Sequence, residues 1–403
     1  MISKLFGARR PQGRAEGRPG KVVFASYGLF DSNSAGHVAG FADGLADLGY
    51  RVAVCGGGWL ERAYAFGDPK FEFFTLDDLA RDPEGVLAFD GEFDPKATTL
   101  VCWTPRESVR RAVAPVIDRW TLPYLVHLED NEAHIAEQAL ARMGGGRPDP
   151  FPAGLTDPEQ IDGFLGAAAG ITVIAEPLKT VIPAHVPTVL LEPGVDFDLF
   201  AQPLDPLRKA TLRRWAGVPE GASVIVYSGN VHASNLEEMR ALYEAIWALR
   251  GRGRNLVLVR TGIDDSDASF LQAGPNERVH KLGHLERRIL IDVVRSADLF
   301  VQPGGPGPFN DYRLPSKLPE FMATGKPLVT SATNLGAYLT DGVNALLLRD
   351  SSAEEIAGHL DRLLGDATFA RRLGKAGQAF ARERFRWPEQ ARKLDAFLRQ
   401  VTA

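Results

Sequence analysis

Residues 21–56 read KVVFASYGLFDSNSAGHVAGFADGLADLGYRVAVCG. This segment begins with an apolar run, Lys21–Tyr27, and ends with another, Arg51–Gly56. Between them, His37–Leu48 repeats apolar side chains at spacings of three and four residues, which is typical of a helix with one buried face. Both runs are mostly apolar without alternation, as in parallel strands that are covered on both faces. The segment therefore predicts a strand, a helix and a second strand parallel to the first.

The same alternation continues along nearly the whole chain. Further apolar runs predict strands over Thr98–Thr104, Pro123–Asp130, Gly170–Ala175, Ser223–Gly229, Asn255–Gly262, Val279–Leu282, Ala297–Pro303, Pro327–Ala332 and Ala345–Arg349. Helical spacing recurs over Leu236–Leu249, Ile289–Val294 and Ile356–Leu364. This order of elements predicts an α/β protein with two Rossmann-like, doubly wound parallel sheets.

The boundary between two domains is expected near residues 193–205. Residues 192–196 are turn-forming residues after an apolar strand, and Gln202–Pro206 contains two prolines. A chain of 403 residues has the length of two domains, which we expect over residues 21–196 and 197–384. Sheets of this kind bind ligands outside the carboxyl ends of their strands. We therefore expect two ligand surfaces that face one central cleft, one for each of two substrates.

The composition is that of a globular protein, since 45% of the residues are hydrophobic and 24% are charged. The net charge of −5 argues against nucleic acid as a partner, because phosphate binding needs clustered cations. Cys55 and Cys102 lie at the ends of apolar runs, so we expect buried free thiols and no disulfide framework or zinc site. No apolar run approaches the roughly 20 residues that span a bilayer. The expected location is therefore the cytoplasm.

Residues 1–20 are predicted to form a flexible basic tail. The cations of this segment are Lys4, Arg9, Arg10, Arg14 and Arg18, against Glu16 as its single acid. One interpretation is a solvated leader. The other is a peripheral contact with anionic lipid on the inner face of the membrane, in which a few apolar residues of the tail insert.

Residues 310–329 read NDYRLPSKLPEFMATGKPLV and carry the most specific chemistry of the chain. Ser316 is expected to cap a short helix that Lys317 opens and Gly325 ends. The unpaired N–H groups at such a helix start suit a phosphate, and Arg313 adds a second positive charge beside Lys317.

Glu320 lies one turn further along this helix. Its carboxylate repels phosphate but accepts hydrogen bonds from paired hydroxyls, as a ribose offers. Together with Arg313 and Lys317, it predicts a nucleotide whose diphosphate lies outside and whose ribose lies inside. The alternative is an ordinary capped helix with an ion pair between Lys317 and Glu320.

Residues 315–329 resemble the signature of the retaining glycosyltransferases of family 4, the group 1 glycosyl transferases, which have the GT-B fold. Three further parts of the chain agree with that family in the same order. Leu191–Phe200 resembles its interdomain stretch, and residues 279–284 with Ala297–Pro303 resemble a pair of strands in its second domain. Residues 385–403 resemble the terminal segment whose helix crosses back onto the first domain.

The resemblance implies a nucleotide-sugar site in which Glu320 binds the ribose, and Lys317 and Arg313 lie along the donor phosphates. The other residues that it assigns to the donor are Gly36, Gly229 and Asn230 at the diphosphate, Leu282 and Gly283 at the base, and Ser316 at the helix start. It also places His127, at the end of a predicted strand, near the reacting sugar.

Two positions depart from the family pattern. Tyr312 stands eight residues before Glu320, where members usually carry a glutamate that contacts the sugar, and Asp311 is one place away. Many members also supply an arginine and a lysine after the turn at Gly229, and this chain has neither there. The cations for the diphosphate are therefore expected from Arg260, Arg313 and Lys317.

The resemblance implies an enzyme that moves a sugar from a nucleoside-diphosphate sugar to a hydroxyl of a glycan, a lipid-linked or a protein acceptor, with retention at the anomeric carbon. The nucleotide sugar is a co-substrate, and no cofactor is expected. His127, Lys317 and Arg313 are the expected catalytic residues, in bacterial surface polysaccharide or glycoconjugate synthesis. The alternatives are a nucleotide-sugar isomerase of the same fold and a non-catalytic subunit or scaffold.

No histidine and carboxylate cluster has metal-ligand spacing, so transfer without a metal ion is expected. The acidic pair Asp264–Asp265 is more typical of a solvated loop. In the first domain, His127 either holds the sugar or is a buried histidine whose hydrogen bonds are satisfied, and His37 lies on an expected cleft loop. Residues 129–132 follow a strand end, where one of them orients the acceptor hydroxyl or Asp130 caps a solvated helix.

Overall fold

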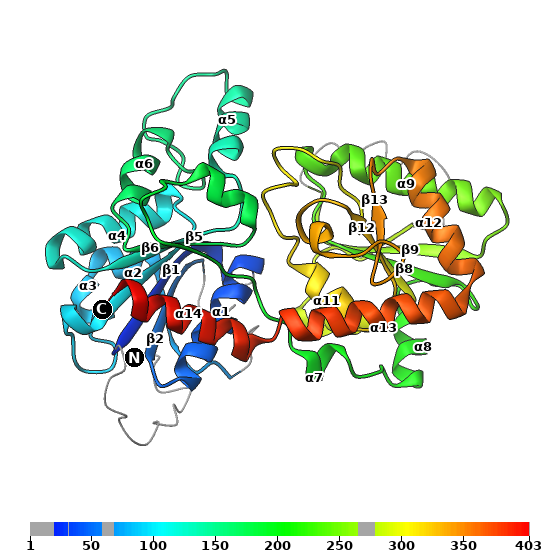
Figure 1. The fold of residues 1–403 in the computed structure, drawn as a ribbon, viewed down its shortest axis with the longest axis horizontal. Helices are drawn as coiled ribbons and strands as arrows, with labels where there is room; N and C mark the ends of the chain where they lie inside the picture. Colours follow the sequence, from blue (N-terminus) through cyan, green and yellow to red (C-terminus); the bar gives the residue numbers. More distant parts are fainter. Residues whose placement is uncertain (1–19, 31, 59–67, 265–278, 403) are drawn as a thin grey trace. The chain divides into compact units, whose positions relative to one another are not determined.

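The structure is a computed structural model that describes residues 20–30, 32–58, 68–264 and 279–402. The chain divides into two compact units, Met1–Gly194 with Trp387–Ala403, and Val195–Arg386 (Figure 1). Apart from Gly20, the predicted basic tail lies outside the described residues. None of the helices in the described ranges is long and apolar enough to cross a membrane.

The first unit is built on a seven-stranded parallel sheet with the order β3-β2-β1-β4-β5-β6-β7. Its strands are β1 (Lys21–Leu29), β2 (Arg51–Gly57), β3 (Glu72–Thr75), β4 (Thr98–Trp103), β5 (Tyr124–Leu128), β6 (Gly170–Val173) and β7 (Thr188–Leu190). Its helices are α1 (Asn33–Asp47), α2 (Leu76–Arg81), α3 (Pro83–Leu87), α4 (Glu107–Trp120), α5 (Glu132–Arg142), α6 (Pro158–Gly166) and α14 (Trp387–Val401).

Helix α14 packs on α1, although the two are far apart in the sequence. A Cβ atom on Gly40 would overlap the ring of Trp387, and one on Gly44 would overlap the side chain of Ala391. These two glycines therefore allow the close approach of α14, whose apolar face joins the core of the first unit.

The second unit is built on a six-stranded parallel sheet with the order β10-β9-β8-β11-β12-β13. Its strands are β8 (Ser223–Ser228), β9 (Leu256–Thr261), β10 (Val279–Lys281), β11 (Leu299–Gln302), β12 (Leu328–Ser331) and β13 (Leu346–Leu348). Its helices are α7 (Phe197–Phe200), α8 (Pro206–Trp215), α9 (Leu236–Gly251), α10 (Arg287–Ser296), α11 (Lys317–Ala323), α12 (Ala353–Gly365) and α13 (Ala367–Arg384).

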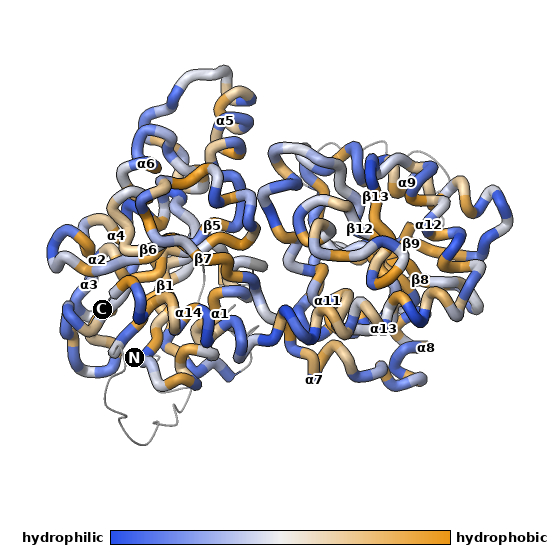
Figure 2. Tube along the Cα trace, in the orientation of Figure 1, coloured by the Kyte–Doolittle hydropathy of each residue, from blue (hydrophilic) through white to orange (hydrophobic). Residues whose placement is uncertain are grey.

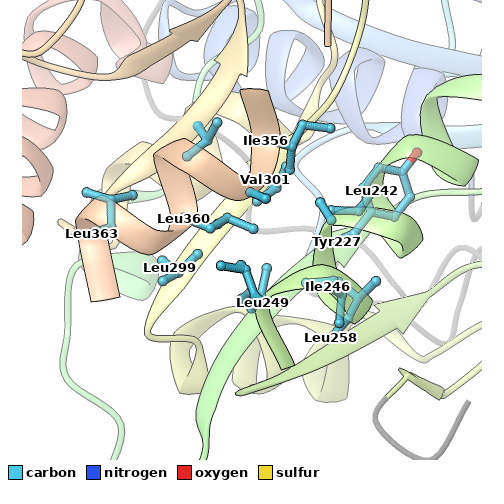
Figure 3. Packing of buried hydrophobic residues seen from close by; sticks show 14 of the residues in the cluster. Tyr227, Leu242, Ile246, Leu249, Leu258, Leu299, Val301, Ile356, Leu360 and Leu363 are labelled. Carbon is cyan, nitrogen blue, oxygen red and sulfur yellow. The ribbon is translucent and has the colours of Figure 1, made fainter. Parts of the chain in front are cut away.

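The core of the second unit forms where α9 and α12 cover its sheet. Side chains of both helices meet those of β8, β9 and β11, among them Leu249, Leu299 and Leu360 (Figure 3). The hydropathy of the chain follows this arrangement, since hydrophobic residues lie along the strands and hydrophilic ones on the outer loops (Figure 2). This burial of apolar surface is the main favourable contribution to the folding free energy of the second unit.

The predicted α/β fold with two doubly wound sheets is confirmed, and every predicted strand is present. Strands β3 and β7 were not predicted. Both lie at edges of the first sheet and are only half-buried, so their sequences lack the continuous apolar run of a central strand. The thiols of Cys55 and Cys102 are free and buried, as expected.

Candidate active site

Each sheet reverses its strand order at one point, between β1 and β4 in the first unit and between β8 and β11 in the second. Open α/β sheets bind ligands at the carboxyl ends of the strands beside such a point. Polar and charged side chains gather there in both units. The second-unit cluster consists of Gly229, Glu238, Arg313, Lys317 and Glu320, and the first-unit cluster of Tyr27, Ser34, His37, Arg106 and Glu129.

Lys317 begins helix α11 and lies against the end of strand β8. A Cβ atom on Gly229 would collide with its ammonium group, so only glycine leaves this space. The ammonium also lies 5.1 Å from the ring centroid of Tyr227, which is buried on β8. Burial and then the charge of Arg313 lower the pKa of Lys317 to about 7, against opposing effects of Glu320 and Glu238. The group therefore gains or loses its proton near neutral pH.

Arg313 supplies the second positive charge, from the loop before α11. Its guanidinium lies 4.3 Å from the ring centroid of Phe309, which holds it by a cation–π contact. Its charge reaches both Lys317 and Glu238. The two cations at one strand end suit an anion that carries two phosphates.

Glu238 was not among the predicted site residues. It lies in the first turn of α9, and its carboxylate accepts a hydrogen bond of 2.5 Å from the side-chain amide of Asn310. Burial raises the pKa of Glu238, although this hydrogen bond and the charges of Arg313 and Lys317 oppose the rise. Its position in the sequence could have indicated Glu238, because α9 follows the first strand of a Rossmann-like unit and begins at the ligand-binding edge of the sheet.

Glu320 forms an ion pair through Oε1 with Arg287, the first residue of α10. The ion pair with Lys317, which the sequence offered as an alternative, is therefore not formed. Arg287 lies 5.5 Å from the ring centroid of Phe200. Burial lowers the pKa of Arg287, but the charge of Glu320, the hydrogen bond to it and the charge of Asp196 together outweigh burial and raise this pKa. The partner on α10 was missed because it lies 33 residues away in the sequence.

Ser316 occupies the position before α11, but its side chain makes no capping hydrogen bond. Its backbone already has helical angles, with φ −54° and ψ −24°, whereas a capping residue is normally extended. The predicted cap is therefore wrong, although the helix starts at Lys317 as expected and Gly325 follows its end with φ +72°.

The turn after β8 and the ends of β9 and β10 come together as expected. The side chain of Asn230 accepts a hydrogen bond of 3.0 Å from the backbone of Ile263, and Gly262 packs against Gly229. The backbone of Leu282 donates to Arg260, and Gly283 accepts from Gly262, each over 2.8 Å. These hydrogen bonds fix the strand ends beside the second-unit cluster.

Arg260 differs from the other predicted cations. Its side chain is 1% exposed and forms an ion pair with Asp264. Asp264 also pairs with Lys281 at 3.2 Å, and both cations outweigh burial and lower its pKa. Asp264 is therefore part of an ion-pair network and not of a solvated loop, and Asp265 lies outside the described residues.

The two residues before Arg313 are held by their own loop. Asp311 accepts a hydrogen bond of 3.1 Å from the backbone of Gly307, which closes a turn. Tyr312 is half-buried on the same loop. Among the described residues, neither side chain contacts the second-unit cluster, so neither replaces the missing glutamate.

In the first unit, His127 is 1% exposed. Its ring stacks on Trp103 at a centroid distance of 3.8 Å, and its Nδ1 lies 2.8 Å from the hydroxyl of Thr172. Burial lowers the pKa of His127 to about 3, so it stays neutral. The ring is therefore buried but only half satisfied, since Nε2 has no hydrogen-bond partner among the described residues, and a role of His127 near the sugar stays a prediction.

The polar side chains at this sheet edge are those around Glu129, just after β5. Glu129 accepts a hydrogen bond from Nδ1 of His37 over 2.7 Å and another from the hydroxyl of Ser34, both on α1. Burial opposes ionisation, but these hydrogen bonds and the charge of His37 lower the pKa of Glu129 to about 2. Gly36, between the two donors, has open space around its Cα, since an added Cβ would meet nothing within 4 Å.

Arg106 links this group to helix α5. Its guanidinium lies 3.9 Å from the ring centroid of Tyr27 and pairs with Glu132 at 3.1 Å. Asn131 caps α5 by accepting from the backbone of His134 over 3.2 Å, so the expectation that Asp130 is the cap is wrong by one residue. The first-unit cluster therefore holds a buried carboxylate, an imidazole and a paired guanidinium.

A cavity of about 580 Å³ lies elsewhere in the first unit, between α4 and α6. Pro123 and Tyr124, at the amino end of β5, line it, so it opens at the edge opposite the first-unit cluster. None of the predicted site residues lines this cavity. Among the described residues, no three or more histidines, cysteines and carboxylates gather as a metal site would require.

Comparison with known proteins agrees with this geometry. Residues 222–366, which contain the second-unit cluster, match the family of glycosyl transferases group 1. A D-inositol 3-phosphate glycosyltransferase of Xylanimonas cellulosilytica is 29% identical over 294 residues, which cover 71% of this chain and 68% of that protein. A GDP-mannose-dependent monoacylated alpha-(1-6)-phosphatidylinositol monomannoside mannosyltransferase of Corynebacterium glutamicum is 23% identical over 224 residues, covering 55% and 58% of the two chains.

Solved structures show the same fold at low identity. The Anabaena protein HepE in complex with UDP and glucose superposes with a TM-score of 0.69 and 16% identity, over 94% of this chain and 99% of that one. A sucrose-phosphate synthase from Thermosynechococcus elongatus gives a TM-score of 0.68 at 16% identity, over 94% and 99%. Residues 222–366, which hold the cations of the second sheet, therefore form a group 1 glycosyl transferase domain, and the chain is a glycosyltransferase with the GT-B fold of its solved neighbours.

Proposed function

We propose that the protein transfers a sugar from a nucleoside-diphosphate sugar to an acceptor hydroxyl, without a metal ion and with retention at the anomeric carbon. The observation that carries the proposal is the approach of Lys317 to Gly229, with Arg313 beside it, at the carboxyl end of β8. A departing diphosphate develops negative charge, and positive groups that are already in place stabilise it. The UDP found in the solved relative HepE is a ligand of this chemical class.

The ribose of the nucleoside is assigned to Glu320, which lies in the first turn of helix α11. Glu320 uses Oε1 for Arg287, and its other oxygen accepts hydrogen bonds from the ribose hydroxyls in this proposal. The backbone of Leu282 and Gly283, fixed by its hydrogen bonds to β9, meets the base. Lys317 and Arg313 take the phosphates, which leave the ribose on the side away from the base.

The reaction breaks the bond between the anomeric carbon and the diphosphate and forms a bond from that carbon to the acceptor oxygen, while the proton of the acceptor hydroxyl passes to the departing diphosphate. Lys317 is suited to this step because its pKa near 7 rises as negative charge develops beside it, so that its positive charge becomes complete. Arg313 is charged throughout. The acceptor is a glycan, a lipid-linked or a protein hydroxyl, and we place the protein in bacterial surface polysaccharide or glycoconjugate synthesis.

A donor screen tests the proposal. Purified protein in EDTA is titrated with UDP-, GDP-, ADP- and dTDP-sugars, and a ligand that binds raises the apparent unfolding temperature by mass action. The donor that binds is then incubated with acceptors, and the products are read by NMR of the anomeric proton. Transfer with retention in EDTA supports the proposal.

Three results contradict it, and each points to something else. An epimerised donor without transfer identifies an isomerase. Binding without any turnover identifies a non-catalytic subunit, and transfer that EDTA abolishes shows that a metal ion takes part.

A further inference from the structure

The hydrogen bond between His37 and Glu129 fixes how the imidazole is protonated. The hydroxyl of Ser34 and Nδ1 of His37 both lie within hydrogen-bond distance of the Glu129 carboxyl, which as a carboxylate can only accept hydrogen bonds. Nδ1 of His37, at 2.7 Å, must therefore carry the hydrogen. In the neutral ring, Nε2 is then left with a lone pair and acts as an acceptor.

The position of the pair makes this acceptor useful. His37 lies in the second turn of α1 and Glu129 at the end of β5, which are the carboxyl-end positions where such sheets take ligands. The side chain of His37 keeps 11% of its surface exposed, and among the described residues Nε2 has no hydrogen-bond partner. Gly36 leaves open space beside it.

The neighbours of the pair favour a neutral ligand. His127 is neutral with its pKa near 3, and burial raises the pKa of Tyr27 to about 12. Arg106 is engaged by Glu132, and Glu129 keeps its negative charge. A buried carboxylate with an imidazole acceptor in front of it repels phosphate and carboxylate groups, whereas a hydroxyl can donate to Nε2.

We propose that His37 binds a hydroxyl of a sugar or polyol substrate through Nε2, and that Glu129 is the residue that positions it. Ser34 supports Glu129 through the second hydrogen bond. The proposal rests on the glycosyl transfer proposed above. The hydroxyl belongs either to the sugar of the donor or to the acceptor, and the experiment separates the two sources.

His37→Asn is the decisive variant. The amide of asparagine reaches the position of Nδ1 and preserves a hydrogen bond to Glu129, but it has no group at the position of Nε2. If His37 is purely structural, His37→Asn should therefore bind substrate like the wild type. If Nε2 binds substrate, the variant should lose affinity. Glu129→Ala should reproduce the loss, and Glu129→Gln should restore part of it because its carbonyl oxygen accepts from Nδ1.

Asp90→Asn is the matched control. Asp90 is also a carboxylate in the first unit that two basic groups bind, Lys21 and Arg51, each at 2.5 Å. Lys21 begins β1, so this group lies at the amino end of the sheet. Asp90→Asn should lower stability without changing substrate affinity.

The first measurement compares the affinities of the nucleotide and the nucleotide sugar that bind in the donor screen, by calorimetry. If the hydroxyl belongs to the donor, His37→Asn weakens the binding of the nucleotide sugar about tenfold and leaves the affinity for the free nucleotide unchanged. If it belongs to the acceptor, both affinities stay the same and the acceptor KM rises about tenfold. The proposal is overturned if His37→Asn has the wild-type affinity for the nucleotide sugar and the wild-type KM for the acceptor.

A second measurement does not depend on the substrate. Nitrogen-15 NMR of histidine-labelled protein at alkaline pH, with the His37 signals identified through His37→Asn, reports which ring nitrogen carries the hydrogen. A hydrogen on Nδ1 that is lost to Nε2 in Glu129→Ala supports the proposal. A hydrogen on Nε2 in the wild-type protein overturns it, and does so even if the donor screen finds no nucleotide sugar and the proposed function itself fails.

Discussion

Gly229 leaves the space that the ammonium group of Lys317 occupies, at the point where the second sheet reverses its strand order. The contact joins the turn after β8 to the first residue of α11, which are 88 positions apart in the chain (317 − 229). Within the part of the chain that the structure describes, no acid forms an ion pair with this ammonium group. This arrangement keeps the charge of Lys317 available to a ligand.

We predict that Gly229→Ala displaces Lys317 and weakens the binding of UDP or the preferred nucleotide at least about tenfold, the loss of one charge-assisted hydrogen bond. The positive φ of +153° adds backbone strain for alanine, so stability also falls. Calorimetry in a Lys317→Ala background separates the two effects, because the binding penalty of Gly229→Ala should vanish there. Gly251→Ala is the control, since its added Cβ meets nothing within 4 Å.

Nucleotide affinity should depend on pH through Lys317. With a pKa of about 7 in the free protein, Lys317 is charged below pH 7 and must take up a proton to bind a diphosphate above it. The affinity should therefore stay level below pH 7 and fall by up to about tenfold per pH unit above it. Titration calorimetry between pH 6 and 9 measures this, and Lys317→Ala should flatten the curve. A slope that persists in the variant assigns the proton to another group.

The fold was predictable because its central strands are buried on both faces. Strands such as β4 and β5 are buried along their whole length, so their sequences are mostly apolar and can be recognised without knowledge of their partners. Edge strands β3 and β7 carry no such run and escaped prediction. The start of α1 was placed at His37, four residues late, because its first turn is polar and its cap is Ser32.

The candidate site was predictable only where its chemistry is local. The segment around α11 contains Arg313, Lys317 and Glu320 within eight positions, and the structure brings them together with Gly229. Partners from distant segments were not predictable. Arg287 contacts Glu320 and His37 contacts Glu129 across 33 and 92 positions of the sequence. For Glu320, the spacing of three residues on a helix suggested Lys317 as the partner instead of Arg287.

Glu320→Ala should remove the preference for a ribose with free hydroxyls. We expect wild-type protein to bind UDP about tenfold more tightly than 2′,3′-dideoxy-UDP, and the variant to bind the two alike. The fold should persist, since the ion pair with the partly exposed Arg287 contributes only about 0–1 kcal/mol. Glu237→Ala is the control, an exposed acid on α9 that pairs with Arg240. A variant that still prefers UDP would show that Glu320 does not contact the ribose.

His127 should affect stability in acid more than turnover. Its pKa is about 3 in the folded protein and near 6.5 in an unfolded chain, so between these values only the unfolded chain takes up the proton. Stability is therefore lost as the pH falls from 6.5 towards 3, by at most about 1.4 kcal/mol per pH unit.

His127→Phe keeps the ring that stacks on Trp103 but cannot be protonated. It leaves the hydroxyl of Thr172 without its partner, at a cost of about 1–3 kcal/mol that does not vary with pH. Urea unfolding at pH 7, 5.5 and 4 should thus give a lower but flatter stability curve than in the wild-type protein. Turnover per folded molecule should stay close to that of the wild type, because the histidine ring is buried. Loss of turnover with an unchanged acid dependence would instead place His127 against the reacting sugar.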